Sequence, residues 1–400
     1  MTFNPFQKGH PDFLKGTVMH LFFQFEKKPL FFTNPEIIIS CFHSLKLSSA
    51  FQEIEQLMDA GYYLAGFLSY EAGYCFEKKL YQNKKYNFPL LHFGAFKKPC
   101  SFYLPIGSKT FCLKNIKTNI SQTLYANDID VIREHIELGD VYQITYCLKQ
   151  KFSFKGNPRA LYQKLLQNQP VPYPAYIETD QFNILSLSPE RFFKKTHNHI
   201  ITEPMKGTWF RGKNIFNDMK ERWRFQYDTK NRAENVMIAD LLRNDLGRIG
   251  KRVRAPKLFT VTPYKTLFQM TSTVTAKIPH HISFYELFAA LFPSGSVTGA
   301  PKIRAMEIIR DIEPEERKIY TGAIGYITPE RNCYFNIPIR SLLIDKISGQ
   351  GEMGVGGGIV WDSTADGEWK EGILKSAFLT SLNNKEEEIF PSPLSFHKNE

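Results

Sequence analysis

Cysteine is scarce in this 400-residue sequence, and the few cysteines form no recognisable pattern. The six cysteines are scattered, with no Cys-x-x-Cys pair and no histidine at the spacing of a zinc site. Neither a disulfide framework nor a zinc centre is therefore predicted. We expect reduced thiols, which are typical of a protein of the cytoplasm.

Long apolar runs are also missing. No stretch approaches 18 apolar residues, and the first residues, MTFNPFQKGHPDFLKG, lack the uninterrupted apolar segment of a signal peptide. We therefore predict a soluble, intracellular protein with no membrane span. Hydrophobic residues make up 42% of the chain and aromatic residues 14%. This composition excludes disorder as the dominant state and suffices for one large core or two fused ones.

Acidic residues are outnumbered by basic ones. The chain has 51 Lys and Arg against 40 Asp and Glu, a formal net charge of +11. Such a balance is compatible with nucleic acid, an anionic membrane surface or an anionic small substrate. The densest basic stretch, GKRVRAPK at 250–257, is short and has no interleaved aromatic residue. Nucleic-acid binding is therefore not predicted.

The glycine motifs of nucleotide-binding proteins are absent. The stretch GEMGVGGGIV places Gly354, Gly356, Gly357 and Gly358 within five positions, which allows backbone N–H groups to converge on an anion. It lacks the G-x-G-x-x-G order and the strand-to-helix context of a dinucleotide site. The stretch SGSVTGAPK likewise fails the P-loop pattern. A dehydrogenase, kinase or ATPase is therefore not predicted.

Strand and helix signals alternate irregularly, and the strands cluster instead of following a strict strand-helix-strand repeat. This pattern predicts an α+β protein with mostly antiparallel sheets. We expect an N-terminal α+β region over 1–115, a catalytic domain over 116–382 and a mobile, charged and Pro/Ser-rich tail over 383–400. The individual predictions are helices from about Asn127 to Gly139, over 232–247 and over 300–314, and strands from near Val141, over 182–195 and over 334–346.

A lysine and a glutamate form the first candidate pair. Lys206 lies in EPMKGT, where a lysine beside a glycine is also compatible with a solvated loop residue. Glu190 lies in LSPERF at the end of an apolar strand, where a buried carboxyl suits a general acid and an exposed one is only a strand-end acid. Glu190 precedes Lys206 by sixteen residues, a distance over which a β-hairpin can form and bring nucleophile and proton donor face to face.

Three further carboxylates are candidate metal ligands. Glu307 shares a helical face with Ile303 and Met306, or lies at the margin of a buried stripe formed by its neighbours. Glu368 and Glu371 share a helix face with Lys375, an arrangement that is also ordinary surface pairing. Glu307 and Glu371 together could hold Mg²⁺, which takes one or two protein carboxylates and completes its shell with water and substrate oxygens.

Seven segments together resemble the chorismate-utilising enzymes, in the order and at the spacing usual for that family. They are SLSPERF, EPMKGT, RAENVMIADLLRNDLGRI, FPSGSVTGAPKIRAMEII, RKIYTGAIGYI, FNIPIRSLLI and GVGGGIVWDS…EWKE…K. The likeness extends over residues 141–375, and GFLSYEAGY at 66–74 extends it toward the N-terminus. The resemblance implies the fold of anthranilate synthase component I, mostly antiparallel sheets packed in a sandwich with flanking helices.

Two positions discriminate between the reactions of this family. Members that make 4-amino-4-deoxychorismate have lysine at the position of Lys206, whereas anthranilate-forming members have a small residue there. Isochorismate- and salicylate-forming members have a water-activating lysine at the position of Gln143, and a glutamine cannot act as that base. The resemblance therefore implies amination of chorismate for p-aminobenzoate and folate synthesis, with Lys206 attacking ring carbon 2 while Glu190 protonates the departing C4 hydroxyl.

The same resemblance assigns the substrate and metal contacts. Arg340 and Tyr320 would bind a substrate carboxylate, and Mg²⁺ on Glu307 and Glu371 would hold the ring carboxylate, with Glu368 as a third ligand or a supporting group. The remaining implied substrate-binding residues are Gln143, Thr208, Gly354, Gly356 and Lys375. Phe268 departs from the pattern, since many relatives have histidine there and some have tryptophan.

The sequence has no G-x-C-x-G-type nucleophile of a glutamine amidotransferase. Ammonia is therefore expected from solution or from a separate glutaminase subunit, and no further enzyme domain is expected after the family likeness ends. Two alternatives stay open. One is an anthranilate-forming member of the family, against which Lys206 argues. The other is a catalytically silent chorismate- or tryptophan-binding regulatory protein, against which the combined presence of Glu190, Lys206, Glu307, Arg340 and Glu371 argues.

Overall fold

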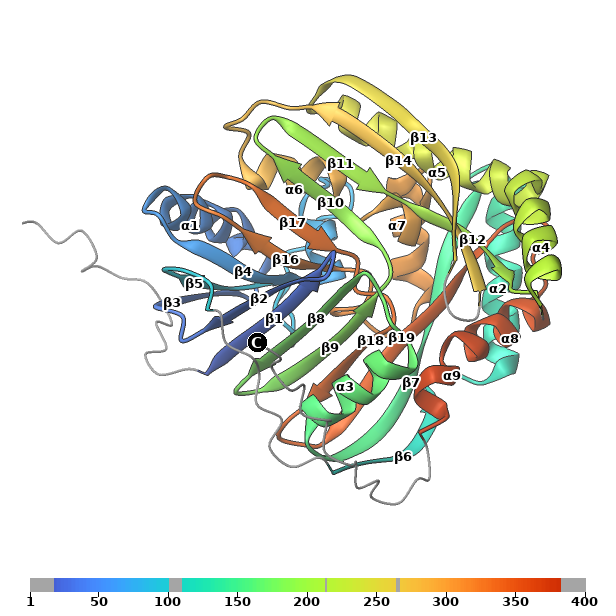
Figure 1. The fold of residues 1–400 in the computed structure, drawn as a ribbon, viewed down its shortest axis with the longest axis horizontal. Coiled ribbons are helices and arrows are strands. Elements are labelled where there is room, and N and C mark those ends of the chain that lie inside the picture. The colour runs from blue at the N-terminus through green and yellow to red at the C-terminus, as the bar shows by residue number, and fades with distance from the viewer. Residues whose placement is uncertain (1–17, 101–109, 213, 264–266, 383–400) are drawn as a thin grey trace, which may run out of the picture.

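The computed structural model describes residues 18–100, 110–212, 214–263 and 267–382, and all strand pairs in this part are antiparallel. The first sheet contains β1 (Met19–Phe25), β2 (Lys28–Thr33), β6 (Phe111–Thr118), β7 (Gln143–Gly156), β8 (Tyr173–Thr179), β9 (Phe182–Ser188), β15 (Gly299–Ala300), β18 (Ser341–Asp345) and β19 (Gln350–Ile359). Their order is β15-β7-β19-β18-β9-β8-β1-β2, and β6 also pairs with β7. β19 and β7 therefore run side by side through this sheet (Figure 1).

The second sheet contains β3 (Ile37–Cys41), β4 (Tyr63–Leu68), β5 (Leu91–Phe96), β10 (Arg191–Thr196), β11 (His199–Glu203), β12 (Met205–Phe210), β13 (Lys251–Pro263), β14 (Leu267–Lys277), β16 (Ala323–Ile327) and β17 (Cys333–Asn336). Their order is β12-β14-β11-β10-β17-β16-β4-β5-β3, and β13 also pairs with β14. The predicted α+β class with antiparallel sheets is confirmed.

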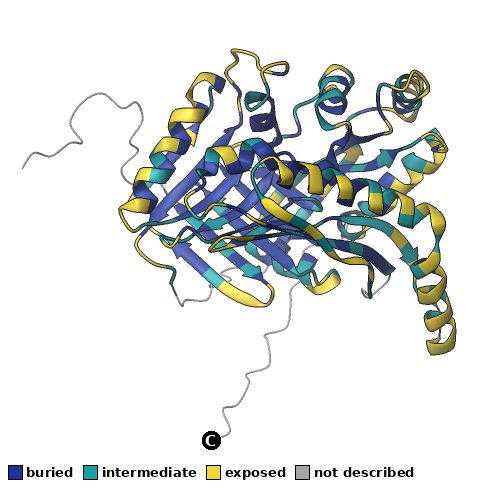
Figure 2. Cartoon of the chain, turned by 90° about the horizontal axis from the view of Figure 1, so that it is seen from above, coloured by how far each residue is buried: buried dark blue, intermediate teal, exposed yellow. Residues whose placement is uncertain are grey.

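The two sheets pack against each other through an aromatic core. Phe23 of β1 lies 5.6 Å from Tyr326 of β16, measured between ring centroids, and Phe25 lies 5.0 Å from Tyr334 of β17. Side chains alternate between the faces of each strand, so that Tyr176 of β8 points into a different cluster from its neighbours on both sides. Figure 2 shows the buried strands at the centre and the exposed residues gathered on the helices.

Helices cover the outer faces of both sheets. The helices of the described part are α1 (Leu47–Asp59), α2 (Gln122–Glu137), α3 (Pro158–Asn168), α4 (Ile215–Tyr227), α5 (Thr229–Gly247), α6 (Phe284–Leu291), α7 (Lys302–Ile312), α8 (Ala365–Lys375) and α9 (Ala377–Thr380), with short 3₁₀ turns η1 (Ser44–Lys46), η2 (Tyr70–Cys75) and η3 (Gly295–Val297). Helices α1, α5 and α6 share a core with the second sheet, and α2, α3 and α7 with the first. The described helices include none that is both long and apolar enough to cross a membrane.

Several local predictions are confirmed, with shifts at their ends. Helix α2 begins five residues before Asn127, because the hydroxyl of Ser121 accepts a hydrogen bond from the backbone N–H of Leu124 at 3.2 Å and caps the helix there. Strands β1 to β5 of the N-terminal region pair within both sheets, and the domain boundary at residue 115 stays a prediction. The predicted mobile tail over 383–400 lies outside the described residues.

The glycine-rich stretch 354–358 forms a regular strand. It belongs to β19, which pairs with β7 as far as Ile359. Strand β18 pairs with the other edge of β19 only up to Met353. Beyond Met353, alternate backbone groups of β19 therefore face an edge that β18 does not cover, and this edge forms part of the site described next.

Candidate active site

Glu190 lies between β9 and β10, at the point where the chain passes from the first sheet to the second. The residue is buried, and its Oε1 accepts hydrogen bonds from the hydroxyl of Ser296 at 2.7 Å and from the backbone N–H of Met205 at 3.2 Å. Burial raises the pKa of Glu190 to about 7, against the lowering effects of these two hydrogen bonds and of Lys206. The carboxyl can therefore hold a proton near neutral pH, as a general acid requires.

Lys206 is aimed into the site by an irregularity in β12. The pairing of β12 with β14 shifts register between Met205 and Thr208, and Gly207 in the shifted segment has a φ of +89°. A bulge redirects the side chains next to it, and a glycine adopts this left-handed backbone without a steric penalty. The glycine of EPMKGT thus meets a backbone requirement of the bulge beside Lys206.

The amine of Lys206 lies against β19. A methyl group added at Gly358 would stand 2.8 Å from Lys206 Nζ and 2.8 Å from the side-chain Nε2 of Gln143. Burial lowers the pKa of Lys206, and the positive charge of Lys375 lowers it further, while Glu234, Glu190 and Glu371 oppose the change. A lowered pKa increases the fraction of neutral amine, which is the nucleophilic form.

Gln143 opens β7 beside this lysine and is completely buried. Neither its amide oxygen nor its amide nitrogen has a hydrogen-bond partner within the described part of the protein. An unsatisfied buried amide is costly, and such groups indicate a place where a ligand or water completes the bonding. Gln143, whose amide approaches Gly358 together with Lys206, is therefore a candidate ligand-binding residue.

The uncovered edge of β19 supplies more polar groups. Lys375 of α8 donates a hydrogen bond from Nζ to the carbonyl oxygen of Gly356 at 2.8 Å. In an antiparallel strand the N–H and C=O groups of one residue point to the same side, so the N–H of Gly356 also faces this edge. A methyl group at Gly357 would stand 2.7 Å from a carboxylate oxygen of Glu368. The glycines thus allow charged side chains to approach the backbone closely.

The predicted carboxylate-binding residues flank the other end of the glycine strand. Tyr320 is buried, and a methyl group at Gly354 would stand 2.2 Å from its ring, so the glycine makes room for the ring. Burial raises the pKa of Tyr320 more than any other effect does. The hydroxyl of Tyr320 interacts with Cys147. Arg340 is half-buried, has a left-handed φ of 53°, and its carbonyl oxygen accepts from the N–H of Leu187.

Not every predicted residue joins this group. Thr208 is exposed and pairs with Gln269 across β12 and β14. Glu307 lies at the margin of the buried face of α7, a quarter exposed, and forms an ion pair with Arg304 at 3.0 Å. Of the two positions that the sequence allows for Glu307, the structure shows the one at the margin of the buried stripe.

The three candidate metal ligands fit Mg²⁺ by chemistry, since all are carboxylates. No cluster of three or more His, Cys, Asp or Glu side chains that could hold a metal ion exists among the described residues. Glu371 pairs with Lys375 at 2.7 Å, and Lys375 lowers the pKa of Glu371 against the effect of burial. Glu368 accepts from the hydroxyl of Ser363 at 2.7 Å, and burial raises its pKa.

Sequence reasoning missed three members of the site. Ser296 donates to Glu190, Gly358 leaves the space that Lys206 Nζ approaches, and Glu234 of α5 acts electrostatically on Lys206. All three lie in segments that the resemblance had singled out. Their individual roles had no local signal, because each depends on contact with a residue far away in the sequence.

Comparisons with known proteins agree with this geometry. The model of the chorismate binding enzyme family matches residues 103–381. Aminodeoxychorismate synthase component 1 of Escherichia coli is 38% identical over 257 residues, which are 64% of this chain and 56% of that protein. Anthranilate synthase component 1 of Lactococcus lactis is 34% identical over 271 residues, 67% of this chain and 59% of that protein. The matched part therefore spans little more than half of these relatives.

A solved structure supports the fold. Anthranilate synthase component I of Streptococcus pneumoniae superposes with a TM-score of 0.73 at 21% sequence identity, covering 94% of each chain. The match to the family model extends over well more than half of the sequence and includes Glu190, Lys206 and the glycine strand. The chain therefore belongs to the chorismate binding enzyme family.

Proposed function

We propose that this protein aminates chorismate to 4-amino-4-deoxychorismate, a step toward p-aminobenzoate and folate. The observation that carries the proposal is the half-buried Lys206, whose amine approaches Gly358 together with the side-chain amide of Gln143, which has no hydrogen-bond partner within the described residues. Glu190, with a pKa of about 7, acts on the same lysine electrostatically. A neutral amine and a protonated carboxyl in one buried site are the two forms that this substitution needs.

The proposed reaction has two substitutions. In the first, Lys206 Nζ forms a bond to ring carbon 2, the double bonds shift, and the C4 hydroxyl leaves as water with the proton of Glu190. In the second, ammonia forms a bond to C4, the double bonds shift back, and the amine of Lys206 leaves. The sum is chorismate plus ammonia giving 4-amino-4-deoxychorismate plus water, with the pyruvyl ether retained. Hydroxide leaves poorly, so the acid is as necessary as the nucleophile.

The substrate is a dianion, and the site offers cationic and backbone donors to it. Arg340 and Tyr320 are proposed to bind one carboxylate, with the N–H groups of Gly354 and Gly356 along the uncovered edge of β19. Lys375 assists there, and Gln143 offers an amide donor to the ring substituents. Thr208 is retained as a candidate on β12, although it is exposed. An arginine fork matches a carboxylate with two parallel hydrogen bonds.

The product assay decides this function. The purified protein is incubated with chorismate, Mg²⁺ and ammonium, and the products are separated and identified by mass spectrometry. We expect 4-amino-4-deoxychorismate. Formation of anthranilate, which has lost the pyruvyl group, or of isochorismate would contradict the proposal. Two of the relatives are named for synthesis of aminodeoxychorismate and of anthranilate. The assay distinguishes directly between these two products.

Ammonia is proposed to come from a separate glutaminase subunit, which the designation of the relatives as component 1 of a synthase supports. Ammonium salts should then sustain the reaction, whereas glutamine should not until a glutaminase is added. A location in the cytoplasm is also proposed, since all six cysteines are unpaired thiols.

Mg²⁺ is proposed to bind Glu307 and Glu371, with Glu368 as a third ligand or a supporting group. The ion supplies positive charge that orients the ring carboxylate of the substrate. A chelator should abolish turnover and added Mg²⁺ should restore it. Glu371→Gln should raise the Mg²⁺ concentration needed for half-maximal activity by about ten- to a hundredfold. The control is Asp366→Asn on the same helix, because Asp366 bonds to the exposed Lys370 and to the side-chain amide of Gln122 and to no proposed metal ligand in the described part of the chain. Equal Mg²⁺ dependence in both variants would contradict the assignment.

The close approach at Gly358 makes a second prediction. Alanine there would place its methyl group 2.8 Å from both Lys206 Nζ and Gln143 Nε2, so the amine must move. A displacement of about 1 Å at a reacting group can lower the rate about a hundredfold, and we expect this loss in kcat. The matched control is Gly247→Ala, where an added methyl group meets nothing within 4 Å. Full activity of Gly358→Ala would contradict the proposed position of the reacting Lys206 Nζ next to Gly358.

A further inference from the structure

The loop 317–322, which carries Tyr320, has an unfavourable backbone. Lys318 and Thr321 have φ values of 56° and 58°, and neither is a glycine. Each residue in this left-handed region costs about 1 kcal/mol or more, so such a loop persists only where its surroundings hold it. The contacts that hold this loop therefore also determine where Tyr320 lies.

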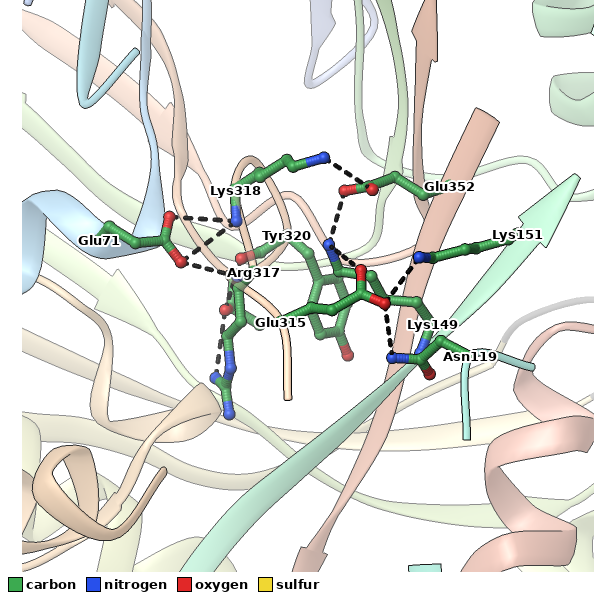
Figure 3. Close-up of polar contacts among 10 residues, drawn as sticks. Glu71, Asn119, Lys149, Lys151, Glu315, Arg317, Lys318, Tyr320 and Glu352 are labelled. Atoms are coloured by element: carbon green, nitrogen blue, oxygen red, sulfur yellow. Dashed lines mark hydrogen bonds and ion pairs between the residues drawn. The ribbon is translucent and has the colours of Figure 1, made fainter. Parts of the chain in front are cut away.

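The N-terminal segment 70–75 provides one side of this support (Figure 3). The carboxylate of Glu71 accepts hydrogen bonds from the backbone N–H groups of Arg317 at 2.7 Å and Lys318 at 3.1 Å. The N–H of Tyr70 donates to the carbonyl oxygen of Lys318 at 2.8 Å. These residues belong to GFLSYEAGY, a segment to which the proposed reaction gives no role.

Arg317 forms the other side, and its guanidinium group is almost fully buried. Two parallel bonds join it to Glu313, at 2.8 and 2.6 Å. The ring of Tyr70 covers the guanidinium group, whose Cζ lies 4.4 Å from the ring centroid. Burial opposes the positive charge, but these partners keep the pKa of Arg317 above its usual value.

The remaining donors of Arg317 reach three segments of the site. Nη2 donates to the carbonyl oxygen of Thr145 at 2.6 Å, two residues after Gln143 in β7. Nη1 donates to the carbonyl oxygen of Val297 at 2.9 Å, directly after Ser296, which holds Glu190. Nη1 also reaches the hydroxyl of Thr321 at 3.3 Å, in the loop of Tyr320. The side chain of Arg317 thus connects the strand of Gln143, the segment of Ser296 and the loop of Tyr320.

We propose that Arg317, held by Glu71 and Tyr70, is a positioning residue that fixes Tyr320 and the Ser296 hydrogen bond of Glu190 in one mutual arrangement. It touches neither substrate nor reacting atoms. The consequence for the enzyme rests on the proposed function, whereas the effect on Glu190 does not. The segment GFLSYEAGY then has a role, which is to brace the catalytic half of the chain from the N-terminal half.

The test compares Arg317→Met and Arg317→Lys with the wild type. First, the carboxyl of Glu190 is titrated in the ligand-free protein by infrared difference spectroscopy, with Glu190→Gln identifying its band. Loss of the Ser296 hydrogen bond should lower the acid dissociation constant of Glu190 about tenfold. Second, turnover is measured with chorismate and ammonium. There kcat should fall because Glu190 moves, and KM for chorismate should rise because Tyr320 moves. Glu71→Gln, which keeps one acceptor oxygen, should lose less than Glu71→Ala.

The control is Arg331→Met, which removes an arginine that is also buried but bonds to Glu55, Asp59 and the carbonyl oxygen of Ile282 instead. The proposal is overturned if Arg317→Met only lowers the melting temperature, as Arg331→Met should, and leaves the Glu190 titration unchanged. Should Arg317→Met not fold, Arg317→Lys and Glu71→Gln carry the same comparison. The titration needs no turnover, so a wild type that fails to make 4-amino-4-deoxychorismate refutes the proposed function and leaves the positioning role to be decided by the titration.

Discussion

Lys206→Ala is expected to abolish the proposed covalent intermediate and to lower kcat with ammonium by about a thousandfold or more, because in the proposed mechanism Lys206 is the nucleophile of the first substitution. The physical basis is the amine, whose pKa is lowered by desolvation and by Lys375. In the wild type, quenching during turnover should yield a chorismate-derived adduct that maps to Lys206 by peptide mass spectrometry.

The control for this experiment is Lys195→Ala. Lys195 is buried and its pKa is also lowered by burial, but its Nζ donates to the carbonyl oxygen of Arg331, away from β19. A general effect of removing a buried amine would appear in both variants, whereas the adduct and the large loss of kcat should be specific to Lys206. If Lys206→Ala retains the wild-type kcat, the lysine is a loop residue and the proposed mechanism is wrong.

Glu190→Gln is expected to lower kcat by about 10²- to 10⁴-fold, since the amide keeps the shape of the carboxyl but cannot donate the proton to the departing hydroxyl. Glu190 must be protonated to act, and burial raises its pKa to about 7. The kcat/KM of the wild type should therefore fall as the pH rises above about 7. Lys206 must be neutral, so kcat/KM should also fall at low pH, where its amine becomes protonated.

The pH profile separates the two residues. In Glu190→Gln the residual activity should lose the decline above pH 7 and keep the rise that belongs to Lys206. Ser296→Ala removes a hydrogen bond that lowers the pKa of Glu190, so the decline should move to higher pH. A profile that is identical in wild type and Ser296→Ala would show that another group sets the basic limb.

Local patterns in the sequence predicted much of the fold. The α+β class, the antiparallel sheets and the helices around 122–137, 229–247 and 302–312 follow from apolar periodicity and from caps such as Pro301. The hairpin of β10 and β11 between Glu190 and Lys206 was predicted from their spacing. The start of α2 was placed late, because the capping role of Ser121 was not recognised.

The site was predictable as a set of residues but not as an arrangement. Motifs single out Lys206, Glu190 and Gln143, and the structure buries Glu190 and Gln143 and leaves Lys206 half-buried, with a pKa lowered by desolvation. The sequence shows that the backbone N–H groups of the glycines at 354–358 can converge on an anion, but it does not indicate that these glycines form a strand, as they do. Periodicity could not decide this, since glycine has no side chain with which to mark the alternating faces of a strand.

The sequence by itself determined which chemistry is present: a lysine, an acid, candidate magnesium carboxylates and a family whose members act on chorismate. Only the tertiary structure decided how these groups are held. The hydrogen bond from Ser296 to Glu190 spans 106 positions, and that from Arg317 to Thr145 spans 172. Periodicity and capping report contacts within a few residues. Contacts across such distances depend on sheet order and register, which form only when both sheets pack around one core.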